Sequence, residues 1–138
     1  MNPMTPLTLA HVCILLAALL PVACAGIAKA GQFSVAPARG GYDNNDPRAW
    51  LARQTGYRAR ANAAQANSFE ALPLFIGAVL VAHQTQAAQG LVNGLALGFV
   101  GLRMVYIGLY LADRPMARSA VWFMAILCSV ALLFSSRL

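Results

Sequence analysis

Residues 60–75, RANAAQANSFEALPLF, join a polar helix start to a strongly apolar segment. On a helix, Asn67 and Glu70 are three residues apart and Arg60 precedes Asn67 by seven, so the three polar side chains lie on one face. The apolar residues continue through Ala82, which places Glu70 where a helix passes from lipid headgroups into hydrocarbon. An ionisable side chain there is costly and normally has a partner or a function. The stretch therefore predicts a membrane-spanning helix with a polar site near one end.

The composition of the whole chain is that of a membrane protein. Hydrophobic residues make up 59% of the 138 residues and charged residues only 10%, against roughly one quarter charged in a soluble domain. In a soluble protein the net charge of +6 would suggest a nucleic-acid partner. Here the basic residues gather in loops beside apolar runs, so we expect no nucleic-acid binding. The three cysteines have no metal-ligand spacing, and we expect buried apolar residues rather than a metal site.

Four apolar runs predict an all-α fold, a four-transmembrane-helix bundle that forms a single domain over residues 1–138. No Lys or Arg precedes the first run, so we interpret it as a membrane span rather than a cleaved signal. Between the first two spans, Asp46-Pro47 predicts the start of a short interfacial helix, capped by the carboxylate. Trp50 has the character of an interface anchor. The predicted spans are residues 7–28, 66–86, 91–112 and 116–134, and the loop with the interfacial helix is 29–57.

The distribution of charge predicts the orientation of the chain in the membrane. Six Lys and Arg residues lie between Lys29 and Gln65, against two Asp residues. Arg114 and Arg118 flank the turn between the third and fourth spans, and the remaining connection carries no charge. Because loops rich in Lys and Arg stay in the cytoplasm, we expect both charged loops there and both termini outside.

This orientation brings polar side chains from three spans to one depth at the cytoplasmic side. They come from the start of the second span, the end of the third and the start of the fourth: Asn67, Glu70, Tyr106, Tyr110, Arg118 and Ser119. One interpretation is that Arg118 and Ser119 merely cap the fourth span. The other is a pocket for an anionic, polar ligand, open sideways to lipid, in which Arg118 binds the anion. A thiol in such a pocket would lose its proton more readily, because a nearby cation favours the charged form.

Arg103 is the one cation expected deep inside the third span, about 14 Å below the following turn. A guanidinium at this depth needs a counter-charge, and Glu70 is the only carboxylate predicted within the spans. We therefore expect a buried structural ion pair between Glu70 and Arg103 that joins the second and third spans. Such a pair does not exclude a ligand site beside it.

The sequence resembles the MAPEG superfamily, the membrane-associated proteins of eicosanoid and glutathione metabolism, and above all its bacterial branch. The resemblance covers nearly the whole chain. It rests on four motifs: Asn67-x-x-Glu70 followed by Leu72-Pro73-Leu74-Phe75, Asn45-Asp46-Pro47-Arg48, Arg103-x-x-Tyr106-x-x-x-Tyr110-Leu111, and Arg118-Ser119-x-x-Trp122.

The resemblance implies a homotrimer in a bacterial inner membrane, with glutathione held between neighbouring protomers. It implies an integral membrane transferase or peroxidase that uses glutathione on lipophilic electrophiles at the cytoplasmic face. Arg118 and Ser119 would lie beside the reacting thiolate as the catalytic residues. The residues expected to contact glutathione are Asn67, Glu70, Tyr106, Tyr110, Arg60 and Trp122.

The chain departs from the glutathione-binding relatives in its second span. Those relatives carry arginines where this chain has Ala63 and, in some, Ala66, and these arginines meet the carboxylates of the tripeptide. Either glutathione is not the ligand, or its carboxylates are met by other arginines, among Arg53, Arg58, Arg60 and Arg114. Two other functions remain open: a non-catalytic trimeric membrane module that binds a lipid or a partner protein, and a small proton-coupled exporter.

Overall fold

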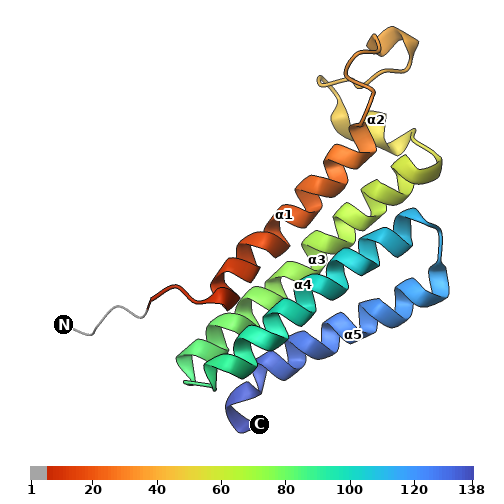
Figure 1. The fold of residues 1–138 in the computed structure, drawn as a ribbon. Coiled ribbons are helices and arrows are strands. Elements are labelled where there is room, and N and C mark those ends of the chain that lie inside the picture. The colour runs from red at the N-terminus through yellow and green to blue at the C-terminus, as the bar shows by residue number, and fades with distance from the viewer. Residues whose placement is uncertain (1–5) are drawn as a thin grey trace.

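The computed structural model describes residues 6–138 as a bundle of four long helices that run alternately up and down (Figure 1). A short helix lies in the loop after the first long helix, and two single 3-10 turns complete the described elements. In chain order these are α1 (Leu9–Lys29), η1 (Pro37–Arg39), α2 (Pro47–Ala52), α3 (Gly56–Gln84), α4 (Gln89–Leu111), α5 (Pro115–Leu133) and η2 (Ser135–Arg137).

The four long helices are each long and apolar enough to cross a membrane, which confirms the predicted fold class. Pro21 and Pro73 lie inside helices that continue past them. Large apolar side chains cover the outside of the bundle, among them Leu15, Met104 and Phe123, each more than half exposed. An exposed apolar surface of this extent is what lipid-facing helices present.

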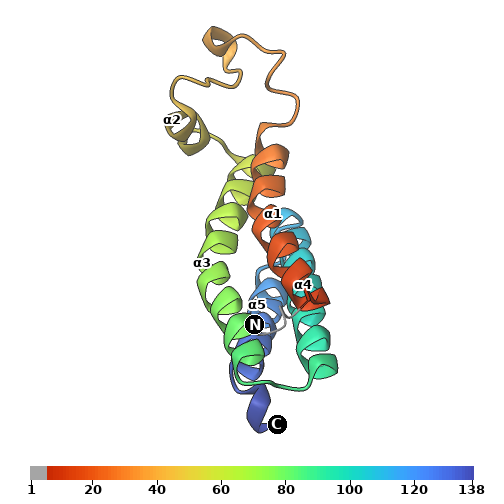
Figure 2. The same cartoon turned by 90° about the vertical axis from the view of Figure 1, so that its left-hand side faces the viewer.

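Small side chains fill the contact between α1 and the rest of the bundle. Ala10, Cys13, Ala17, Cys24 and Ala28 lie along one stripe of α1, and each is at most 2% exposed. Small residues let helix backbones approach closely, which improves van der Waals packing between helices inside a membrane. Helix α1 packs chiefly on α3, and α4 packs chiefly on α5 (Figure 2).

The loop between α1 and α3 extends beyond the end of the bundle and has a small core of its own (Figure 1). Helix α2 begins at Pro47, and Asp46 caps it by accepting a hydrogen bond from the Ala49 amide at 3.1 Å, as predicted. Trp50 differs from the prediction of an interface anchor, because its side chain is only 2% exposed. Its indole Nε1 donates to the Gly40 carbonyl at 3.1 Å, and its ring meets that of Tyr42 edge-on. The loop therefore folds around this tryptophan.

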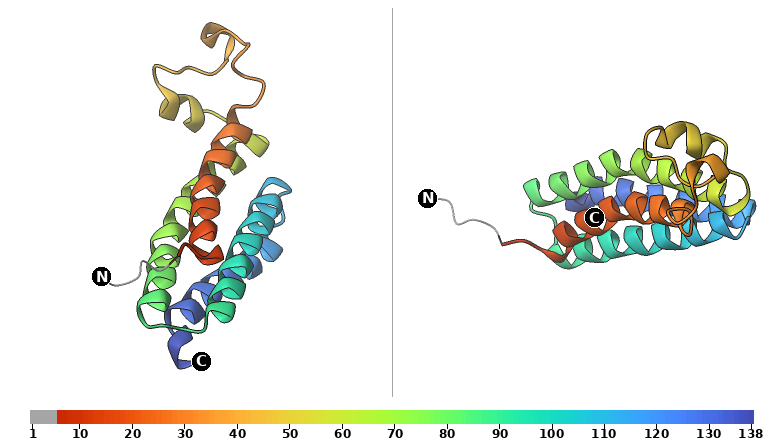
Figure 3. Two further views of the ribbon diagram at one scale, coloured as in Figure 1. Left: turned by 60° about the vertical axis from the view of Figure 1, so that its left-hand side comes forward. Right: turned by 90° about the horizontal axis from the view of Figure 1, so that it is seen from above.

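The turn from α3 to α4 lies at the end of the bundle opposite the loop that contains α2 (Figure 3). Polar side chains join α1, α3 and α4 at this end. The rings of His11 and His83 lie 4.2 Å apart, and the Thr8 hydroxyl is within hydrogen-bond distance of both. Asn93 accepts a hydrogen bond from the Ala10 amide at 3.1 Å. These contacts close the end of the bundle that carries no charged loop.

The long helices differ in length. Helix α3 has 29 residues and α5 has 19, which correspond to about 44 and 29 Å at 1.5 Å per residue. A hydrocarbon layer is about 30 Å thick, so α3 is too long to lie wholly within it. The first turns of α3, which carry Arg58 and Arg60, extend toward the loop that contains α2 (Figure 2).

Candidate functional site

Six side chains from α3, α4 and α5 line one cavity of about 180 Å³ at the end of the bundle that carries the charged loops. The cavity brings together five residues that the sequence singles out for their polar groups and the predicted Trp122. They are Asn67, Tyr106, Tyr110, Arg118, Ser119 and Trp122. The three helices run alternately, so the start of α3 and α5 meets the end of α4. This topology places residues far apart in the sequence around one space.

Arg118 is the cation on the wall of this cavity. Its guanidinium carbon lies 4.2 Å from the centroid of the Tyr110 ring, a geometry in which the ring face attracts the cation. None of the carboxylates in the described part of the chain forms an ion pair with Arg118 within 4.0 Å. The tyrosine therefore holds the guanidinium in place without neutralising it, and its charge stays available to an anion in the cavity.

Ser119 and the two tyrosines supply hydroxyl groups to the same cavity. Ser119 is exposed on the first turns of α5, next to Arg118. The rings of Tyr106 and Tyr110 meet edge-on with their centroids 5.6 Å apart, which is a favourable arrangement of two aromatic side chains. Hydroxyl donors beside a cation are the groups that stabilise a thiolate or another small anion.

Arg103 is buried behind the cavity, with only 2% of its surface exposed. Its Nη1 donates to Asn67 Oδ1 at 3.0 Å and its Nη2 donates to Ser68 Oγ at 3.1 Å. Its guanidinium carbon also lies 4.2 Å from the centroid of the Tyr106 ring. Arg103 thereby fixes the orientation of Asn67, one of the residues that line the cavity.

The predicted ion pair between Glu70 and Arg103 does not form directly in this structure. Within residues 6–138 no carboxylate oxygen lies within 4.0 Å of the guanidinium. Instead Asn67 lies between the two charges, because its amide nitrogen donates to Glu70 Oε2 at 3.3 Å while its amide oxygen accepts from Arg103. Asn67 and Glu70 share a helix face, and the residue nearer to the guanidinium is the asparagine.

Ser68 is a part of this network that the sequence interpretation missed. Its side chain is 3% exposed, and its hydroxyl accepts from Arg103. Serine in an apolar helix often hydrogen-bonds to its own backbone. The presence of a serine therefore does not by itself predict a side-chain contact with another helix. The signal available in the sequence is its position beside Asn67, at the depth of a buried arginine.

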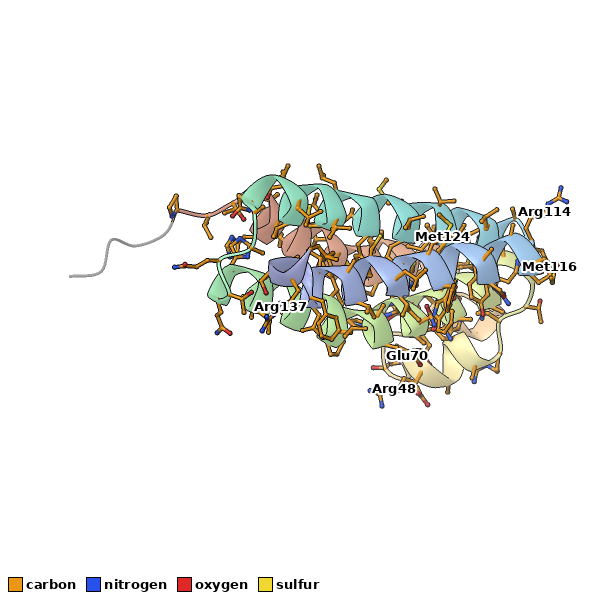
Figure 4. The ribbon with its side chains drawn as sticks, turned by 90° about the horizontal axis from the view of Figure 1, so that it is seen from below. Arg48, Glu70, Arg114, Met116, Met124 and Arg137 are labelled. Atoms are coloured by element: carbon orange, nitrogen blue, oxygen red, sulfur yellow. The ribbon has the colours of Figure 1, made fainter. Side chains whose placement is uncertain are left out.

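Two predicted ligand contacts lie outside this cavity. Glu70 is exposed at the edge of the bundle, on the side where Arg48 of α2 projects (Figure 4). Arg60 does not line the cavity, and its Nε donates to the Leu111 carbonyl at 3.1 Å, where it caps the last turn of α4. An arginine at the C-terminal end of a helix meets both free carbonyls and the negative end of the helix dipole. Arg60 therefore ties α3 to α4.

A second cavity, of about 140 Å³, lies deeper between the same three helices. It shares Asn67 and Trp122 with the first cavity, and Arg103 and Glu70 also line it. Its remaining walls are mainly apolar: Ala71, Leu74, Phe99, Ala125 and Ile126, with Ser129 at its deep end. The polar cavity and the apolar cavity thus adjoin at one asparagine and one tryptophan.

The residues of a single chain offer an anion site but not a complete site for a tripeptide. Small-molecule pockets are usually roughly 300–1,000 Å³, and the polar cavity has about 180 Å³. Arg118 and the hydroxyl groups suit a thiolate. The exposed arginines Arg53 and Arg114 do not line this cavity, so the carboxylates of a tripeptide would have to be met by residues beyond it. The arrangement fits glutathione only if a second copy of the chain completes the site.

The fold and the cavity define a class of protein, an integral membrane four-helix bundle with a polar site at the end that carries its charged loops. Comparison with known families goes one step further. The MAPEG family matches residues 9–138, essentially the whole chain, and the chain therefore belongs to the MAPEG family. No curated protein and no solved structure matches the chain. Its place in a bacterial branch of the family stays a prediction.

Proposed function

We propose that this protein is a membrane transferase or peroxidase that binds glutathione in the polar cavity and uses its thiolate on lipophilic electrophiles. The observation that carries the proposal is the position of Arg118. Its guanidinium lines the cavity next to Ser119, is held by the face of Tyr110, and has no described carboxylate as an ion-pair partner. Membership of the MAPEG family supports a role in this chemistry.

Each side chain around the cavity has a defined part in the proposed reaction. The Arg118 cation and the Ser119 hydroxyl favour the thiolate over the thiol, so the thiol proton passes to water. With an aryl halide, the sulfur then forms a bond to the ring carbon and the halide leaves with its electron pair. Asn67, fixed by Arg103, and the tyrosine hydroxyls orient the bound peptide. Holding both reactants in one site replaces a bimolecular encounter by a positioned reaction.

The proposal includes a homotrimer, in which neighbouring protomers complete the site. The small volume of the polar cavity within one protomer supports this arrangement. The exposed carboxylate of Glu70 supports it too, because a charge on the outer surface of an apolar helix needs a polar neighbour in the membrane. A second copy of the chain brings arginines from the charged loops, and one of them would meet Glu70 or a carboxylate of glutathione.

The direct test is a titration of the purified protein with glutathione, followed by tryptophan fluorescence. Trp122 lines the cavity, so we expect a saturable change with a dissociation constant of about 1 mM, which is a weak but specific affinity. The same change should be absent from the Trp122→Phe variant, because the other tryptophan, Trp50, lies in the core of the loop. Wild-type protein with no response at roughly 10 mM glutathione would exclude the proposal.

The proposed orientation, with the charged loops in the cytoplasm, is tested by labelling of introduced cysteines. Ser34 is exposed in the charged loop, and Ala88 is exposed at the opposite end of the bundle. In intact cells we expect a membrane-impermeant maleimide to label Ala88→Cys and not Ser34→Cys, and both after the membrane is opened. The wild-type chain is the background control, since Cys13 and Cys24 are buried and the half-buried Cys128 lies within the apolar helix α5. Labelling of Ser34→Cys in intact cells would reverse the orientation.

One observation favours a second function, a non-catalytic trimeric module that binds a lipid or a partner protein. The positions at which related proteins carry arginines for glutathione are alanines here, and the arginine nearest to them in the sequence, Arg60, is engaged with a backbone carbonyl. Such a module would bind no glutathione and conjugate no chlorodinitrobenzene, whereas turnover in the purified protein would exclude it.

A further inference from the structure

Two histidines and a threonine form a hydrogen-bonded cluster between α1 and α3, at the end of the bundle away from the polar cavity. Thr8 Oγ1 lies 2.9 Å from His11 Nδ1 and 3.0 Å from His83 Nε2. The centroids of the two imidazole rings are 4.2 Å apart. All three side chains are half-buried, so the cluster can exchange protons with water. These are the only two histidines of the chain, and neither lines the polar cavity.

The surrounding hydrogen bonds decide which ring nitrogens carry hydrogen when both rings are neutral. His83 Nδ1 lies 2.8 Å from the Val79 carbonyl. A carbonyl only accepts, so Nδ1 carries the hydrogen of His83 and Nε2 keeps a free lone pair. The Thr8 amide donates to His11 Nδ1 at 3.0 Å, so this nitrogen is an acceptor too. Two acceptor nitrogens therefore face one hydroxyl group.

This arrangement is one proton short of a complete set of hydrogen bonds. The Thr8 hydroxyl has a single hydrogen and can donate to only one of the two nitrogens. The other contact of the neutral cluster places two lone pairs against each other. One proton added to His83 Nε2 removes this conflict, because Nε2 then donates to Thr8 Oγ1 and the hydroxyl donates to His11 Nδ1. The result is a continuous chain of hydrogen bonds from the Val79 carbonyl to His11.

The ends of the two helices favour a positive charge on His83 over one on His11. His83 lies in the last turn of α3, and His11 is the third residue of α1. A cation is stabilised near the C-terminal end of a helix and destabilised near the N-terminal end. A proton on His11 Nδ1 would also break the hydrogen bond from the Thr8 amide. The geometry therefore admits one proton, and it assigns that proton to His83.

The other groups near the cluster do not neutralise this charge. Helix α4 meets this end of α1 with the uncharged Asn93, which also bonds to Gln89. Cys13, the next titratable side chain along α1, is buried in the apolar core. Arg137 and the terminal carboxylate at Leu138 are exposed in the tail after α5, and within residues 6–138 neither bonds to the cluster. The four carboxylate side chains of the sequence lie in other parts of the chain: Asp43, Asp46, Glu70 and Asp113.

We infer that Thr8, His11 and His83 form a proton-operated latch, in which one proton bound at His83 completes a hydrogen-bond chain that ties the start of α1 to the end of α3. The chain itself links α1 to α3 only through the loop at the opposite end of the bundle. The latch closes the end that has no such link, and it holds more firmly in a mildly acidic medium than in an alkaline one. It is independent of the proposed glutathione chemistry.

Nitrogen NMR of protein that contains isotope-labelled histidine tests the bound proton directly. The chain has two histidines, so protein purified through a histidine-free tag gives two imidazole spectra, and His11→Gln assigns them. At about pH 8 we expect hydrogen on Nδ1 of His83 and on Nε2 of His11. At about pH 5.5 only His83 should carry hydrogen on both nitrogens. Protonation of both rings together, of His11 first, or of neither ring would overturn the inference.

Thermal unfolding in detergent tests whether the proton ties the helices together. Thr8→Val removes the hydroxyl between the rings, whereas Thr8→Ser keeps it. From about pH 8 to about pH 5.5, we expect the midpoints of the wild type and Thr8→Ser to rise by roughly 3 °C relative to that of Thr8→Val. The matched control is Thr85→Val at the same end, because the Thr85 hydroxyl donates to the Val81 carbonyl rather than to an imidazole. This control should follow the wild type. An equal pH response in Thr8→Val and the wild type would overturn the latch.

Discussion

Replacing Arg118 with alanine is expected to lower kcat/KM for glutathione conjugation of chlorodinitrobenzene by roughly 100-fold, the loss typical of removing one group that stabilises a reacting anion. Arg118 is the cation that lines the polar cavity and has no described carboxylate as a partner. Without it the bound thiol should ionise only near its solution pKa, about 8.5. The rate of Arg118→Ala should therefore keep rising with pH after the wild-type rate has levelled off.

Two control variants test whether the loss of kcat/KM comes from the place of Arg118 in the polar cavity or from the loss of a positive charge alone. Arg137 lies at the opposite end of the bundle from Arg114 and the α4–α5 turn (Figure 4), so Arg137→Ala removes the same charge without touching the cavity and should keep wild-type activity. Arg118→Lys keeps the charge but loses the planar guanidinium that lies over the Tyr110 ring, and its activity should fall between those of Arg118→Ala and Arg137→Ala. An Arg118→Ala enzyme with wild-type kcat/KM and an unchanged pH profile would remove Arg118 from the reaction.

Replacing Arg103 with alanine is expected to have the largest effect on stability. The change removes two hydrogen bonds from a charged donor, to Asn67 and Ser68, and each such bond contributes about 1.5–3 kcal/mol. We expect a loss of about 3 kcal/mol or more and a fall in the thermal midpoint in detergent of roughly 10 °C. Arg103→Lys should recover little, because a single ammonium does not reproduce the planar fork that reaches both partners.

A double-mutant cycle identifies the cause of that loss. If Arg103 acts through Ser68, the combined variant Arg103→Ala with Ser68→Ala should be less destabilised than the sum of the two single variants. Arg114→Ala is the matched control, since Arg114 is exposed at the turn between α4 and α5, and should leave the midpoint unchanged. Additive effects of Arg103 and Ser68, or a stable Arg103→Ala, would contradict the network.

The fold could be predicted from the sequence because its signals are local and strong. Four long apolar runs separated by charged or polar segments leave little choice but four spanning helices. Asp46 followed by Pro47 predicts the start of α2 for the same reason, since a cap and its first helical residue are neighbours in the chain. Trp50 was wrongly interpreted as an interface anchor, because its burial depends on the path of the loop and on the Gly40 carbonyl ten residues earlier.

The residues that line the candidate site could be predicted from the sequence. The hydrogen bonds among the polar side chains around it could be predicted less well. Alternating helices bring the start of α3, the end of α4 and the start of α5 to one end, which places Asn67, Tyr110 and Arg118 around a common cavity. The partner of Arg103 was not predictable, because Asn67 and Glu70 share a helix face and side-chain geometry selects between them. The contact of Arg60 with Leu111 links residues 51 positions apart, a relation that no local pattern encodes.

Because α3 is longer than α5, we expect the polar cavity to lie near the boundary between water and lipid. The first turns of α3 exceed the hydrocarbon layer, so the residues that follow, including Asn67, sit where water gives way to lipid. In the proposed reaction, a water-soluble peptide would reach the polar cavity from the aqueous side, and a lipophilic electrophile would reach it from the lipid. Neither reactant has to be dissolved in the medium that excludes it, and a charged product formed there returns to water without crossing the bilayer.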